Sequence, residues 1–177
     1  MDIRRQLLQA HSRQNADLVE AHVVDNPTAI IALMSCFFSD EVSVAQRAAQ
    51  VVGNLGRHHP SLLEPWWEEM VAAAEQPVHV AIRRNVARYF SELELDLPKK
   101  LETQIVDSFT RWVSEKDTPV AVAVFAMQFV ADRCCQFPEH GQRIRHVIEQ
   151  KIDSASAGFK NRGQKILKQI DEHTQDR

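Results

Sequence analysis

The apolar positions of this chain recur in a helical pattern with a period of about 40 residues. Within each copy the spacings are four, one and three residues, which places every member on one face of a helix. The copies are Val44-Ala48-Ala49-Val52, Ile82-Val86-Ala87-Phe90, Val122-Ala126-Met127-Val130 and the degenerate Arg162-Ile166-Leu167-Ile170. A proline follows each full copy at the same offset, at residues 60, 98 and 138. This period is typical of stacked helix pairs.

Helical periodicity extends over the whole chain, which has only 5 glycines and no sustained alternation of the kind seen in strands. It predicts nine or ten helices. They are a short N-terminal helix and helices at about 15–25, 27–38, 41–57, 62–75, 77–94, 98–115, 118–135, 139–153 and 157–173. Because no segment rich in Gly or Ser divides them, we expect residues 1–177 to form a single domain.

Capping residues precede several of these helices. Three pairs suit helix starts: Asn26-Pro27, Ser39-Asp40 and Thr118-Pro119. Ser61 and Glu64 have the spacing of a capping box, but Pro65 directly behind them lacks the N–H that a helix interior needs. Glu64 is therefore an alternative cap, with Pro65 at the first helical position.

The second helix of each pair resembles the HEAT-like repeats, in which an Asp or Pro precedes Val-Arg, then Ala-Ala and a large aliphatic residue. Asp40 with residues 44–53 matches this pattern closely, and Pro77 with residues 82–90 keeps the arginine. The third copy departs from it, because Ala123 stands in place of the arginine. The resemblance implies an all-α fold, a right-handed α-solenoid of four to five HEAT-like helix pairs.

The whole chain is also similar to a group of small bacterial HEAT-like proteins that share an Ala-Gly-Phe-Lys ending before a basic last helix. Here residues 156–163 read SAGFKNRG. Some members of that group carry the label adenylosuccinate lyase. The chain lacks the Gly/Ser-rich loop and the length of that lyase superfamily, so the resemblance predicts a fold and no chemistry.

In such a solenoid the second helices usually line the concave side, and their outward positions form the candidate binding face. We expect this face to bind a partner through Arg47, Arg57, Arg84, Arg88, Phe125, Gln128, Lys165 and Lys168. In this hypothesis Arg84 and Arg88 are paired donors to an acidic peptide or a phosphate, and Phe125 is an apolar anchor. The alternative is a solvated face with Phe125 turned into the next helix interface.

The amino-acid composition and net charge of the chain limit the classes of partner that it is expected to bind. The chain is 44% hydrophobic and 25% charged, with a net charge of −3 and a pI of about 6.2. This balance gives no overall attraction to nucleic acid or an anionic membrane. No run approaches the roughly 20 apolar residues of a membrane helix, and residues 1–5 lead into no secretory signal. We therefore expect a cytoplasmic protein.

The sequence indicates no catalytic residue, cofactor or metal ligand set. Cys36 is isolated, and the adjacent Cys134-Cys135 pair has neither metal-ligand nor redox spacing, which favours a role in helix packing. His58-His59 is read as a loop corner that ends a helix, because adjacent histidines rarely ligate one ion. No nucleophile triad or phosphate-binding glycine loop occurs.

Three functional hypotheses remain open. The preferred one is a non-catalytic scaffold that binds another protein or peptide. The second is a nucleic-acid binder distantly like the HEAT-like alkylpurine DNA glycosylases, which need aromatic residues and an acid in a basic groove. Against it, Trp66, Trp67 and Trp112 fall on first helices, so the groove set contains no Trp, and Asp132 sits beside no aromatic cage. The third is a homodimer, with one tryptophan of the 66–67 pair packed inward and its neighbour at the contact.

Overall fold

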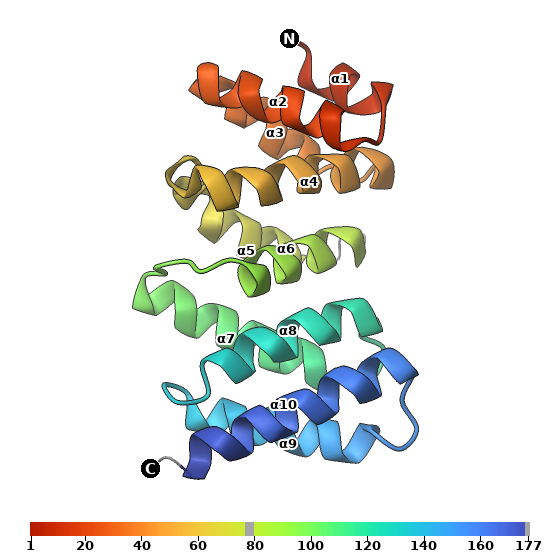
Figure 1. Cartoon of the computed structure of the whole chain (residues 1–177), viewed down its shortest axis with the longest axis vertical. Coiled ribbons are helices and arrows are strands. Elements are labelled where there is room, and N and C mark those ends of the chain that lie inside the picture. Colours follow the sequence, from red (N-terminus) through yellow and green to blue (C-terminus); the bar gives the residue numbers. More distant parts are fainter. Residues whose placement is uncertain (77–79, 176–177) are drawn as a thin grey trace. The chain divides into compact units, whose positions relative to one another are not determined.

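The computed structural model describes residues 1–76 and 80–175, and the regular structure within them is entirely helical (Figure 1). The α-helices are α1 (Ile3–Gln9), α2 (Arg13–Asp25), α3 (Ile30–Phe37), α4 (Val42–His58), α5 (Trp67–Glu75), α6 (Val80–Glu92), α7 (Lys99–Ser114), α8 (Val120–Asp132), α9 (Pro138–Lys151) and α10 (Ala157–Gln175). Each corresponds to one of the ten predicted helices. Pro77, and with it the predicted start of the sixth helix, lies outside the described residues.

The periodic pattern predicts the buried positions well. The first, second and fourth members of each full copy are at most 1% exposed, and the fourth copy buries Ile166 and Ile170. Ala48 and Ala87 are fully buried, which lets their helices approach neighbouring elements closely. The pattern therefore marks the core-facing sides of α4, α6, α8 and α10.

Helix starts differ from the capping predictions. Before α5 the chain forms two 3₁₀ turns, η2 (Pro60–Leu62) and η3 (Glu64–Trp66), so the α-helix begins at Trp67 rather than near residue 62. Glu64 is the first residue of η3 and makes no capping hydrogen bond. This prediction was wrong because Pro65 and Pro60 favour short proline-initiated turns over one continuous helix.

Two other predicted caps are also absent from the described helix starts. The Asn26 side chain turns back and donates to the carbonyl of His22, in the preceding helix. Thr118 donates its hydroxyl to Glu115 instead of accepting from a helix N–H. Ser39 does accept, at 3.1 Å, but from the N–H of Glu41, which precedes α4. Local side-chain bonds thus compete with capping at these sites.

The chain divides into two compact units, and the first comprises Met1–Tyr89. Within it α2 packs on α4, α1 packs on α3, and α3 pairs with α4 (Figure 1). At the end of this unit the buried Trp67 indole donates to the hydroxyl of Tyr89 at 3.0 Å, which joins α5 to α6. Trp66 is half-buried, so one tryptophan of the pair packs inward as expected.

The second unit comprises Phe90–Arg177 and repeats this arrangement. Here α7 pairs with α8, α8 packs on α10, and α7 packs on α9 (Figure 1). Its core is aromatic: the Phe129 ring makes edge contacts with Phe90 and Phe109, and the Phe109 ring also packs against Trp112. Lys151 of α9 donates to the carbonyls of Val113 and Glu115 and so caps the end of α7.

Each unit has its own core, and the interpretation of residues 1–177 as a single domain remains a prediction. None of the described helices combines the length and the apolar run that crossing a bilayer requires.

Candidate functional site

The candidate binding residues of the first unit lie on α4 and α6. We call the outward polar positions of these helices that belong to Met1–Tyr89 the arginine face; it consists of Gln46, Arg47, Gln50, Asn54, Arg57, Arg84 and Arg88. All of them are exposed or half-buried, as the helical wheel predicts. The helical wheel also predicts an outward position for Asn85. Asn85 is instead buried, and its amide nitrogen lies 3.5 Å from the Ala45 carbonyl oxygen. These seven positions contain four arginines and no carboxylate; the next outward position of α6, the exposed Glu92, belongs to the second unit.

The four arginines of this face differ in their contacts and exposure. Arg47 donates to the carbonyl of Leu7 at 2.9 Å, which ties α4 to α1. Arg57 is exposed and donates to Asn54 on the preceding turn of its own helix at 2.7 Å. Arg88 is exposed and Arg84 is half-buried. Arg47 is thus part of the framework, and the other three present guanidinium groups at the surface.

The candidate residues of the second unit lie on α8 and α10. Gln128 donates to Asp132 and Gln169, and its carbonyl oxygen accepts from Arg162 at 2.8 Å. Gln169 also donates to Asp132, so the four side chains form a network that joins the two helices. Gln128 therefore has a structural role, whatever else it contacts.

The remaining candidates of this unit are more accessible. Lys165 is exposed, Lys168 pairs with Glu172 at 3.6 Å, and Phe125 is half-buried. The role of all eight candidate residues in partner binding stays a prediction.

The second unit also contains a pocket of about 590 Å³, which is lined by residues 90–96 together with Asp132 and Arg133.

Arg133 holds one wall of that pocket in place. Its Nε donates to Glu102 of α7 at 2.8 Å, and each of the two side chains is only 16% exposed. Its guanidinium carbon also lies 3.6 Å from the centre of the Phe129 ring. Ionic, hydrogen-bonding and cation–π contacts thus converge on one side chain. Apolar periodicity does not single out this residue, because its partners are distant in the chain or apolar.

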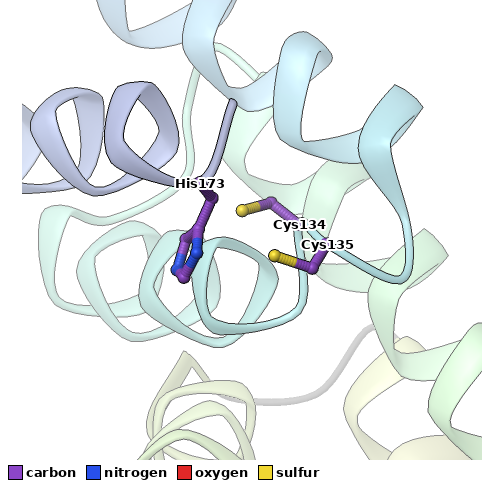
Figure 2. Close-up of side chains that lie close together, drawn as sticks. All are labelled: Cys134, Cys135 and His173. Atoms are coloured by element: carbon purple, nitrogen blue, oxygen red, sulfur yellow. The ribbon is translucent and has the colours of Figure 1, made fainter. Parts of the chain in front are cut away.

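A second group of side chains gathers where α8 ends. The sulfur atoms of Cys134 and Cys135 and a ring nitrogen of His173 all lie within 4.8 Å of one another (Figure 2). We call these three residues the thiol–imidazole cluster. Cys134 is buried, Cys135 is exposed and His173, on the last turns of α10, is half-buried. Figure 2 shows both thiols directed toward the imidazole.

The cluster depends on a turn that the sequence did not predict. The helix expected to run to residue 135 ends at Asp132, and residues 133–136 form turns with a 3.2 Å bond from the Cys134 N–H to Ala131. In a continuous helix adjacent side chains point about 100° apart. The turn instead brings both thiols to one side, where α10 supplies the histidine.

The surroundings of Cys134 are apolar and tightly packed. Burial raises the pKa of the Cys134 thiol, and the neighbouring Cys135 and Asp132 add to the increase. A Cβ atom placed on Gly141 of α9 would lie only 2.8 Å from the Cβ of Cys134. The glycine therefore allows α9 to approach the turn that carries the thiols. Burial likewise raises the pKa of Cys36, in the other unit.

The helix pairs, their buried repeat positions and their spacing agree with one known family. The family model for the HEAT repeat domain matches residues 3–170. The chain belongs to the HEAT repeat family. Its all-α fold of helix pairs is that of a HEAT α-solenoid. No curated protein and no solved structure matches the chain.

Two arginines of the second helices, Arg47 and Arg83, bond within the framework. Arg47 bonds to α1, and Arg83 donates from its Nε to the carbonyl of Ala74, at the end of α5, at 3.2 Å. In the third copy Ala123 is buried in the arginine's place. Arg47 and Arg83 therefore have structural roles.

Proposed function

We propose that this HEAT repeat protein is a non-catalytic scaffold that binds an acidic segment of a partner protein on its arginine face. The composition of that face carries the proposal: its seven positions on α4 and α6 hold Arg, Gln and Asn but no Asp or Glu. The chain as a whole has a net charge of −3, so this absence is local. A surface with this composition is complementary to carboxylates.

The side chains suit that partner chemically. A guanidinium group can donate two parallel hydrogen bonds to a carboxylate, and the Gln and Asn side chains can bond to a peptide backbone. The helix that carries most of them is firmly held, because Val44, Ala48 and Val52 are buried and Arg47 bonds to Leu7. Little ordering of the scaffold is then needed on binding, which favours affinity.

Nucleic acid is a weaker candidate. A glycosylase-like site needs aromatic side chains that can stack on a base. Trp112 is fully buried, and Trp67 is 5% exposed and bonded to Tyr89, so neither can reach a ligand without unfolding its surroundings. Trp66 is half-buried, but it lies on η3 and is not part of the arginine face. These observations favour a protein partner over DNA.

The proposal is tested with labelled peptides of matched length that are acidic, neutral or basic, alongside single-stranded and duplex DNA. Fluorescence anisotropy is measured for wild type, Arg84→Glu/Arg88→Glu and the control Arg5→Glu/Arg13→Glu. The control makes the same charge change at exposed arginines of α1 and α2. Circular dichroism checks that each variant is folded.

We expect acidic peptides to bind wild type and the control, and to bind Arg84→Glu/Arg88→Glu about tenfold or more weakly. Equal binding of acidic peptides to both double variants, or no binding to wild type, would contradict the proposal. Preferential binding of DNA with a steep dependence on salt would favour the nucleic-acid hypothesis instead.

A further inference from the structure

The thiol–imidazole cluster combines donors from two places in the second unit. Cys134 and Cys135 lie on the turn between α8 and α9, and His173 lies on α10, which packs on both of those helices. Two sulfur atoms and an imidazole nitrogen are the donors that borderline and soft metal ions prefer. Hard ions such as Mg²⁺ and Ca²⁺ select oxygen donors instead.

The distances fit metal coordination closely. In a tetrahedral zinc site, metal–ligand bonds of about 2.0–2.3 Å place neighbouring ligand atoms roughly 3.5–3.8 Å apart. The three ligand atoms here lie within 4.8 Å of one another, so the largest contraction needed is about 1.0–1.3 Å. Cys135 is exposed and His173 is half-buried, so rotation of these two side chains can supply it.

One ligand of the thiol–imidazole cluster, Cys134, is held in place by the packing around it. Cys134 is 6% exposed, and α9 approaches it closely at Gly141. A fixed inner ligand with two adjustable outer ligands leaves one side of the site open to solvent. Three protein ligands with an open fourth position is an arrangement that zinc sites use.

We propose that Cys134, Cys135 and His173 bind a thiophilic divalent metal ion of the Zn²⁺ type, with the two sulfurs coordinating as thiolates. Each coordinating thiol gives up its proton to solvent as the metal–sulfur bond forms, and no oxidation or reduction is involved. The ion links the end of α10 to the turn after α8. This site is independent of the arginine face, which lies in the other unit.

The test uses tag-free full-length protein, kept reduced, and titrated with Co²⁺ as a spectroscopic substitute for Zn²⁺. Thiolate coordination gives a sulfur-to-cobalt charge-transfer band, and Zn²⁺ should displace Co²⁺ because it binds such sites more tightly. The variants are Cys135→Ser and His173→Gln. The matched controls are Cys36→Ser, the remaining cysteine, and His146→Gln, an exposed histidine on α9.

We expect one Co²⁺ per wild-type chain, with a charge-transfer band that Zn²⁺ abolishes. Cys135→Ser should weaken the band and lower the affinity about tenfold or more, and His173→Gln should lower the affinity while retaining the band. Both controls should bind Co²⁺ and Zn²⁺ with the affinity of wild type. Because Cys135 is exposed, its substitution should leave the fold intact, whereas substitution of the buried Cys134 could disrupt it.

A second readout is stability. Zn²⁺ should raise the unfolding temperature of wild type and of Cys36→Ser, but not that of Cys135→Ser, because an ion that binds only the folded state stabilises it. Absence of a charge-transfer band in wild type would overturn the proposal. So would a band of the same intensity and affinity in Cys135→Ser, and the pair would then be explained by helix packing alone.

Discussion

Burial sets the properties of individual side chains in this protein, and Tyr89 shows this most directly. It is 4% exposed and accepts a hydrogen bond from Trp67. Burial raises its pKa to about 12, although the bond from Trp67 opposes the shift. The sequence predicted that one tryptophan of the 66–67 pair would pack inward, but it gave no means of finding the partner. That pairing depends on how α5 and α6 meet in space.

The raised pKa of Tyr89 makes stability depend on alkaline pH. The unfolded chain releases the phenol proton near pH 10, whereas the folded protein retains it to about pH 12. Folding stability should therefore be unaffected by this group below pH 10 and should fall by about 2–3 kcal/mol as the pH rises to 12. Tyr89 is the only tyrosine, so ultraviolet absorbance reports its ionisation alone.

The expected titration midpoint is near pH 12 in the native protein and near pH 10 in urea. In Tyr89→Phe, urea unfolding should lose this part of the alkaline destabilisation. A native midpoint near pH 10 would show that the phenol is not buried.

Gly141 is predicted to be sterically required. Gly141→Ala places a Cβ 2.8 Å from the Cβ of Cys134, and neither atom can rotate away. We expect a loss of about 1–3 kcal/mol in the free energy of unfolding, measured with urea. The matched change is Gly53→Ala in α4, where the nearest atoms belong to the flexible Arg57 guanidinium at 3.8 Å or more. That variant should be stabilised by about 0.5–1 kcal/mol. Equal stability of the two variants would contradict the close approach.

At the scale of elements, periodicity located every helix, but interactions between helices decided several ends. The buried faces of α4, α6 and α8 followed from the spacing of Val, Ala and large apolar residues. The end of α8 did not, because residues 133–135 contain no glycine or proline. There the Arg133 side chain bonds to Glu102 and covers Phe129, and α9 approaches at Gly141. The Glu102 contact joins residues that are distant in the sequence, and apolar periodicity indicates none of the three contacts.

The thiol–imidazole cluster was not predicted, because it also depends on how the helices pack. The adjacent cysteines have no metal-binding spacing, and His173 joins them only after α10 packs on α8 and α9. The arginine face was easier to predict, since exposure on a helix follows from the wheel. Asn85 was the exception, because it bonds to α4.

Arg133 should be the main polar link between α7 and α8. Arg133→Ala removes the ion pair to a largely buried Glu102 and uncovers Phe129. We expect a loss of about 2–4 kcal/mol in the free energy of unfolding. Arg133→Lys should recover only part of it, because an ammonium group cannot reproduce the planar contact with the ring. Arg143→Ala, at an exposed arginine of α9, should change stability by less than about 0.5 kcal/mol. A similar small effect for Arg133→Ala would contradict this role.

At the scale of the whole molecule, the chain is a HEAT repeat protein whose two units are built from the same kind of helix pair. The repeated core supports the fold and leaves the outward positions of the second helices able to vary. In the first unit those positions are rich in arginine, and in the second they carry lysines and a network centred on Gln128. Function in such a protein is expected to lie in these variable surfaces.

The central claim is that the arginine face recognises a protein partner, and affinity purification from source-cell lysate tests it most directly. Wild type, Arg84→Glu/Arg88→Glu and Arg5→Glu/Arg13→Glu are compared with and without nuclease, and the captured proteins are identified by mass spectrometry. The account predicts a partner that wild type and the control retain, that nuclease does not release, and that Arg84→Glu/Arg88→Glu loses. Retention of the same proteins by all three, or loss of the partner only after nuclease treatment, would contradict it.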